Sequence, residues 1–100
     1  MSILENLDAF KLTLKKNQPN TDWPLGLQSM WWDMKGNWEA AHDIAQEMIS
    51  QDGSWIHAYL HRKEGDRFNA EYWYSRANKT FPKITLDNEQ EVLVAYFIGG

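Results

Sequence analysis

A chain of 100 residues, with 43% hydrophobic and 24% charged residues, has the composition of one globular domain, and we expect a single domain over residues 1–100. The net charge of −4 disfavours a nucleic-acid-binding protein, which usually presents a basic surface. The absence of cysteine excludes disulfides and cysteine-based metal sites, and the lack of a basic leader or a long apolar run predicts a soluble, cytoplasmic protein that does not enter a membrane.

Apolar residues at helical spacing, interrupted by glycine and proline, predict six helices along the chain. Asn37 and Ser54 are suited to cap the third and fourth of them. Either Asp66 or Asn69 can cap the fifth. The predicted helices cover residues 3–16, 24–35, 38–50, 55–63, 70–79 and 85–100.

The last predicted helix has a competing interpretation as a strand, because the run EVLVAYFI in residues 91–98 is rich in β-branched and aromatic residues. Asp87 followed by Gln90 resembles a capping box, which favours the helix. We therefore expect a helix, with Glu89 and Glu91 as solubility charges on its solvated face.

Two segments of the chain, KGNWEAAHDIAQEM and EGDRFNAEYWYSRA, align without a gap and pair Gly36 with Gly65, an offset of 29 residues. This pattern resembles the tetratricopeptide repeat, a helix–turn–helix unit in which small residues let two helices approach closely. The small positions of the pattern are held by Ser29, Ala41, Ala58 and Ala70.

The resemblance covers residues 25–82 and departs from the family in two respects. A standard repeat has about 34 residues, and His57 and His61 replace the usual apolar and aromatic residues of its first helix. The phrases KGNWEAAHDIAQ and WIHAYLHRKEGDRFNAEYWYSRA also look like a family of short, uncharacterised, mostly bacterial proteins with a tetratricopeptide-like fold. The expected fold is all-α, with about six helices: two tetratricopeptide-like hairpins between N- and C-terminal capping helices.

One face of the fourth predicted helix combines aromatic and basic side chains, namely Trp55, Tyr59, Arg62 and Lys63. In the repeat family the corresponding face lines the groove that holds a peptide, and aromatic and arginine residues are frequent anchors of interfaces. The first functional hypothesis is therefore a small interaction module that binds a protein or peptide partner, or a second copy of itself as a homodimer, through this face.

The second hypothesis rests on the histidines. His57, His61 and Glu64 lie at helical positions 0, +4 and +7, on one side of the helix, and His42 on the preceding helix can join them. Such a group can bind a divalent metal, transfer protons, or form a structural hydrogen-bond network. This hypothesis is a small-ligand-binding protein or enzyme with Trp38 and Tyr72 as a roof, and it assigns no catalytic residue, metal or cofactor. Its candidate pocket consists of His42, His57, His61, Glu64, Tyr72 and Arg76.

Overall fold

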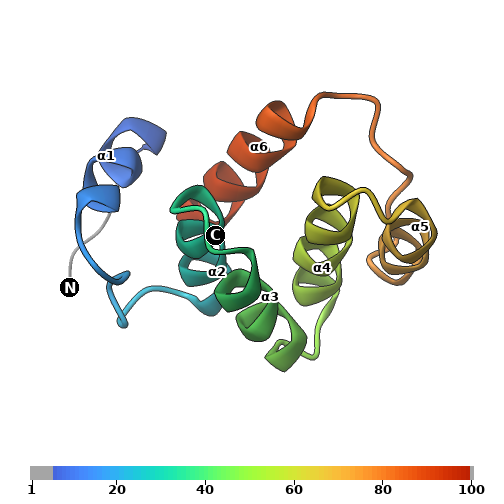
Figure 1. Ribbon diagram of the computed structural model, residues 1–100, viewed down its shortest axis with the longest axis horizontal. Helices are drawn as coiled ribbons and strands as arrows, with labels where there is room; N and C mark the ends of the chain where they lie inside the picture. Colours follow the sequence, from blue (N-terminus) through green and yellow to red (C-terminus); the bar gives the residue numbers. More distant parts are fainter. Residues whose placement is uncertain (1–5, 100) are drawn as a thin grey trace.

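The computed structural model describes residues 6–99, and within that range the regular structure is helical, with no strand. This confirms the all-α prediction and decides against a strand at residues 91–98. Residues 3–5 of the first predicted helix lie outside the described range. The helices are α1 (Leu7–Leu12), the short 3₁₀ helix η1 (Thr13–Lys15), α2 (Leu25–Met34), α3 (Trp38–Glu47), α4 (Gln51–Lys63), α5 (Arg67–Arg76) and α6 (Leu86–Gly99), as Figure 1 shows.

The turns inside the two hairpins follow the predicted local signals. Asn37 caps α3 and Asp66 caps α5, because the side chain of each accepts a hydrogen bond from the backbone N–H three residues later, at 3.0 and 3.1 Å. The fifth helix is therefore capped by Asp66 and not by Asn69. Gly36 and Gly65 have φ angles of +91° and +89°, the left-handed conformation in which glycine commonly ends a helix.

Helix α4 begins about one turn earlier than the sequence predicted. Ser50 caps it in place of Ser54, since the Ser50 hydroxyl accepts a hydrogen bond from the Gly53 N–H at 3.1 Å. Asp52 and Gly53, which fall between the predicted helices 38–50 and 55–63, thus lie within α4. A Cβ atom at Gly53 would come within 2.1 Å of the Met48 carbonyl oxygen, so only glycine permits this close approach of the α3–α4 connection.

Helices α2 and α3 form one hairpin, α4 and α5 form the second, and α3 packs against α4 between them. The small residues Ser29, Ala41, Ala58 and Ala70 are completely buried in these contacts. The Ser29 hydroxyl also donates a hydrogen bond to the Ala41 carbonyl oxygen at 2.8 Å. Small side chains therefore allow the close helix approach that the sequence predicted.

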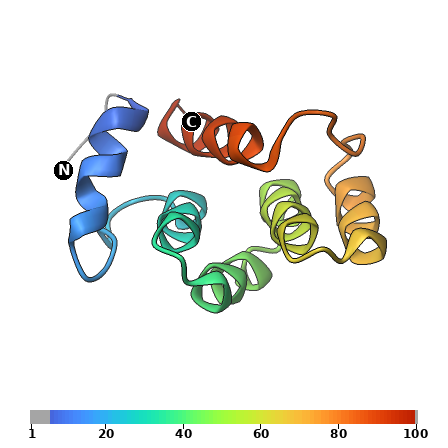
Figure 2. The ribbon, with the colours of Figure 1, turned by 45° about the horizontal axis from the view of Figure 1, so that its top comes forward.

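Helix α6 does not cap the free end of the second hairpin as expected. The loop of residues 77–85 leads the chain back, and α6 packs on α2, α4 and α1. In Figure 2, α2 to α5 form an arc and α6 crosses its open side. Its first turn is capped by the Thr85 hydroxyl, which accepts from the Asn88 N–H at 3.1 Å, in place of the predicted Asp87–Gln90 capping box.

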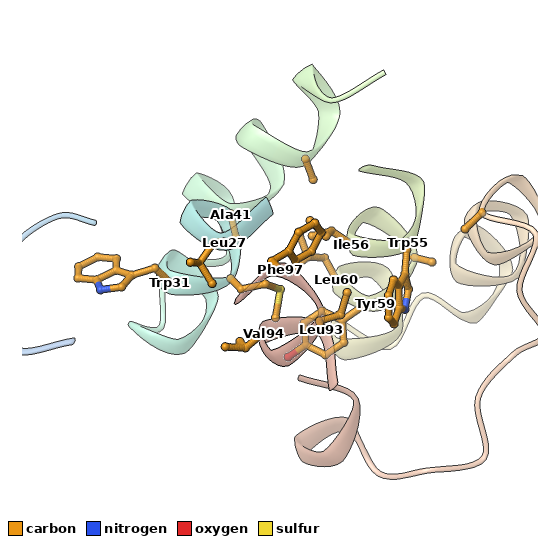
Figure 3. Close-up of a cluster of buried hydrophobic side chains, with 14 of the residues drawn as sticks. Leu27, Trp31, Ala41, Trp55, Ile56, Tyr59, Leu60, Leu93, Val94 and Phe97 are labelled. Carbon is orange, nitrogen blue, oxygen red and sulfur yellow. The ribbon is translucent and has the colours of Figure 1, made fainter. Parts of the chain in front are cut away.

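The hydrophobic core lies where α6 meets α2 and α4. Figure 3 shows Leu93 and Phe97 of α6 in one cluster with Leu27 of α2 and Leu60 of α4, and all four are buried. A Cβ atom at Gly26 would lie 2.3 Å from the Phe97 ring, so this glycine lets α6 approach α2 closely. No helix within residues 6–99 has both the length and the apolar character required to cross a bilayer.

The N-terminal segment covers the outer side of the first hairpin, as predicted for a cap. Phe10 of α1 is completely buried and lies 5.7 Å from the Trp23 ring between centroids. The Trp31 indole N–H of α2 donates a hydrogen bond to the Thr13 hydroxyl of η1 at 3.1 Å. These contacts fix α1 and η1 beside α2.

Candidate functional site

The predicted binding face of α4 is covered by α6. Trp55 is 8% exposed and Tyr59 is 1% exposed, and the charged ends of Arg62 and Lys63 are paired within the molecule. The sequence predicted an open face because it placed the last helix at the end of α5. In the structure that helix occupies the position where a bound peptide was expected.

The partner of Arg62 is a buried carboxylate on α6, that of Glu89. Glu89, which is 2% exposed, accepts hydrogen bonds from the Arg62 guanidinium at 2.8 Å, from the Tyr74 hydroxyl at 2.6 Å and from the Trp55 indole at 3.2 Å. Burial, together with this carboxylate acceptor, raises the pKa of the Tyr74 hydroxyl. The expectation that Glu89 lies on a solvated face was wrong, and the residue instead joins α6 to α4 and α5.

The partner of Lys63 is a second buried carboxylate, that of Asp33 on α2. It is 2% exposed and accepts hydrogen bonds from the Tyr59 hydroxyl at 2.7 Å, the Lys63 ammonium at 2.9 Å and the Gln90 amide at 2.7 Å. Burial, followed by the neighbouring Asp33 carboxylate, raises the pKa of Tyr59. Three helices thus meet at one carboxylate, and the aromatic and basic face of α4 serves to hold the fold together.

The three histidines of the chain converge at the seam between α3 and α4. Nε2 of His42 lies 2.9 Å from Nε2 of His57, and the His57 and His61 rings stack with centroids 4.9 Å apart. One ring nitrogen of each histidine lies within 4.8 Å of the other two. We call these residues the histidine cluster.

Two tryptophans enclose the histidine cluster. Trp38 stacks on His42 at 4.8 Å between centroids, in the position predicted for a roof, and Trp73 stacks on His57 at 3.9 Å. Tyr72, the second predicted roof residue, is half exposed and interacts with Arg76 instead. Trp73 thus forms a wall of the site that the predicted pocket did not include.

Glu64 orients the third histidine. Its carboxylate lies 2.6 Å from Nδ1 of His61. Because an ionised carboxylate can only accept a hydrogen bond, Nδ1 of His61 carries the hydrogen and, in the neutral ring, Nε2 keeps its lone pair. His57, His61 and Glu64 lie on one side of α4, as predicted. The two imidazoles are in contact, and the Glu64 carboxylate contacts that of His61.

The environments of His57 and His42 favour uncharged imidazoles. Burial, and then the neighbouring His42 and His61, lowers the pKa of His57 to about 4. Burial also lowers the pKa of His42, as does His61, while Asp43 and Glu64 oppose that shift. At neutral pH, His57 and His42 are therefore neutral and each has a nitrogen lone pair available.

Acidification is expected to destabilise the fold through His57. The unfolded state binds a proton on this side chain near pH 6.5 and the folded state only near pH 4, so the unfolded state holds more protons between these values. We expect the free energy of unfolding to fall by about 1–3 kcal/mol from pH 6.5 to pH 4 because of this group.

Urea unfolding at a series of pH values, in buffer containing EDTA, measures this loss. The variant His57→Gln is the control, because carboxylates also titrate as the pH falls and their contribution remains in the variant. An unfolding free energy that falls equally steeply in both proteins over this range would contradict the assignment to His57.

An open groove of about 700 Å³ adjoins the histidine cluster, between the end of α3, the start of α4 and the end of α5. His57, Trp73 and Arg76 form one part of its lining, and Ile49, which is 99% exposed, forms another. Among the described residues, no carboxylate lies within ion-pair distance of Arg76. Its guanidinium lies 5.6 Å from the centre of the Trp73 ring.

The structure brings together only part of the predicted polar pocket. His42, His57, His61 and Glu64 form one connected group, whereas Arg76 and Tyr72 lie on α5 and contact each other at 3.3 Å. No protein-family model matches the chain, and neither curated proteins nor solved structures include a significant match. The likeness to tetratricopeptide repeats and to the short bacterial proteins therefore stays a prediction.

Proposed function

We propose that this protein is a small, cytoplasmic, tetratricopeptide-like interaction module that binds an acidic segment of a partner protein in the groove between α3, α4 and α5. The observation that carries the proposal is Arg76, an exposed guanidinium on the groove wall with no carboxylate partner among residues 6–99. An arginine in that setting is suited to bind a carboxylate through two parallel hydrogen bonds.

The rest of the groove supports the same ligand chemistry. Gln51, Gly53 and Ser54 in the first turn of α4 line the groove, and the N-terminal end of a helix carries a partial positive charge. Ile49 and Trp73 add apolar surface beside it. A segment that pairs an acidic residue with an apolar one would therefore match both parts of the groove.

This proposal moves the binding surface from the face predicted by sequence. Trp55 and Tyr59 are buried beneath α6, and their partners Glu89 and Asp33 lie inside the fold. The groove lies on the other side of α4 and is open to solvent. A peptide can reach it without displacing any helix.

A small carboxylate ligand is the second candidate occupant, because His57 borders the groove and could contact such a molecule. That alternative corresponds to a ligand-binding protein or an enzyme, for which no catalytic residue is assigned. A second copy of the chain is the third candidate. The experiment below separates these three occupants.

Short peptides that combine leucine with glutamate are expected to bind, and the same peptides with lysine in place of glutamate are not. Binding should shift the NMR signal of the Trp73 indole, which lies in the groove lining. The variant Arg76→Gln should weaken binding by about 10- to 100-fold, the loss expected for a charge-assisted hydrogen bond.

The matched control is Arg67→Gln. Arg67 lies on the same helix, is also exposed, and already pairs with Glu71 at 2.8 Å, so its loss should leave the affinity unchanged. Equal weakening of peptide binding by both variants would contradict the proposed role of Arg76. Binding of small carboxylates without binding of peptides would favour the second candidate, and a dimer mass by light scattering would favour the third.

A further inference from the structure

All the imidazoles of this protein lie in one place. The sequence contains three histidines, separated by up to 19 positions, and the fold brings a ring nitrogen of each within 4.8 Å of the other two. His42 comes from α3, and His57 and His61 come from successive turns of α4. A metal ion requires several ligands at one place, and here two neighbouring helices supply them.

The spacing is close to that of a tetrahedral metal centre. Zinc binds imidazole nitrogen at about 2.0–2.1 Å, which places neighbouring ligand nitrogens about 3.3 Å apart. The Nε2 atoms of His42 and His57 are 2.9 Å apart, and one ring nitrogen of each of the three histidines lies within 4.8 Å of the other two. Side-chain shifts of about 1 Å would therefore suffice to place three imidazoles around one ion.

We infer that His42, His57 and His61 form a binding site for one divalent transition-metal ion, with zinc as the best fit. Imidazole is a preferred ligand of zinc, and three histidines leave a fourth position for water or a bound ligand. This inference does not depend on what binds in the groove, since it rests on the three rings and their supports alone.

The supports around the histidine cluster resemble those that a metal site needs. Ligating histidines usually donate their second ring N–H to a carboxylate or carbonyl, which fixes the tautomer. His61 does so to Glu64 at 2.6 Å. The His42 ring is held by Trp38, whose own indole N–H donates to the Leu60 carbonyl oxygen at 2.9 Å. These contacts hold the rings in place before any ion binds.

A hydrogen-bond network without a metal explains the cluster less completely. The contact between His42 and His57 can be one hydrogen bond, if one Nε2 donates and the other accepts. That bond leaves His61 out, because its Nε2 has no hydrogen-bond partner in the described part of the chain. A shared cation would use all three rings in the same way.

The test is calorimetric titration of EDTA-treated, dialysed full-length protein with zinc sulfate. We expect one ion per chain and a rise in the melting temperature. Cobalt(II) in place of zinc should give the visible absorption bands of a four-coordinate site with nitrogen ligands. Because the chain has no histidine outside this cluster, imidazole ligands can come only from His42, His57 and His61.

Single substitutions test whether the zinc ion binds at the histidine cluster. His42→Ala, at a half-buried position, should weaken zinc binding by at least about 100-fold, and Glu64→Gln should weaken it by about 10- to 100-fold through loss of the hydrogen bond to His61. Glu47→Gln, an exposed carboxylate on α3, should leave zinc affinity unchanged. Arg76→Gln should also leave it unchanged, which separates this test from the test of peptide binding.

Two results would overturn the inference. One is the absence of zinc binding to the folded wild-type protein. The other is binding that persists at full affinity in His42→Ala, since the ion would then be held by surface carboxylates. His57→Ala is not needed for the decision, because its buried ring also contributes to packing against Trp73.

Discussion

Replacing Glu89 with alanine is expected to lower the free energy of unfolding by about 3–5 kcal/mol. The substitution would leave the Arg62 guanidinium, whose side chain is largely buried, without its carboxylate partner. It would also remove the acceptor of the Tyr74 hydroxyl and the Trp55 indole. Since a domain of this size is commonly stable by only about 5–15 kcal/mol, α6 should detach readily in the variant.

Urea unfolding followed by circular dichroism measures this loss. Glu91→Ala is the matched control, two positions along the same helix, because Glu91 is half exposed and pairs with the equally exposed Lys11 at 3.3 Å. An exposed pair of that kind contributes at most about 1 kcal/mol. Equal losses in the two variants would show that Glu89 does not hold α6 on the rest of the fold.

Replacing Asp33 with alanine is expected to lower the free energy of unfolding by about 2–3 kcal/mol, less than the loss of Glu89. The Tyr59 hydroxyl would be left buried without an acceptor. The Lys63 ammonium, however, can turn to water, because its side chain is 38% exposed. The expected loss of stability is therefore smaller for Asp33 than for Glu89, because Lys63 is more exposed to solvent than Arg62.

The same urea experiment ranks the two variants. Asp43→Ala supplies the control, since Asp43 is an exposed carboxylate on α3, and its loss should change stability by less than about 0.5 kcal/mol. A loss in Asp33→Ala as small as that of the control would contradict the role of Asp33. A loss larger than that of Glu89→Ala would contradict the argument from solvent exposure.

The helices and hairpin turns could be predicted because their signals are local. Gly36 and Gly65 require a positive φ angle, and Asn37 and Asp66 cap the helices that follow. Each of these effects involves residues at most four positions apart. The start of α4 was mispredicted because Gly53 has a packing role, which is visible only once the Met48 carbonyl is placed beside it.

The position of α6 could not be predicted from local signals. It depends on pairings across the chain, such as Gln90 with Asp33, which are 57 positions apart. A weak signal existed: Glu89, Leu93 and Phe97 follow one another at intervals of four, so the carboxylate belongs to the apolar stripe of the helix. A carboxylate in such a stripe indicates a buried partner, and Arg62 is that partner.

Part of the candidate site could be predicted because its residues are close together in the sequence. The spacing of His57, His61 and Glu64 on one helix was enough to place them together. His42 lies on the preceding helix, α3, and joins them where the two hairpins pack together. Trp73 was overlooked between two tyrosines, although it lies three positions after Ala70 and so faces α4.

The location of α6 across the arc has a consequence for the order in which the protein folds. Hairpin contacts close short loops, whereas the Lys11–Glu91 pair joins residues 80 positions apart and must order nearly the whole chain. Closing a long loop costs more conformational entropy and slows the step that depends on it. The two hairpins are therefore expected to assemble first, with the last helix sealing the apolar interior in a later and slower event.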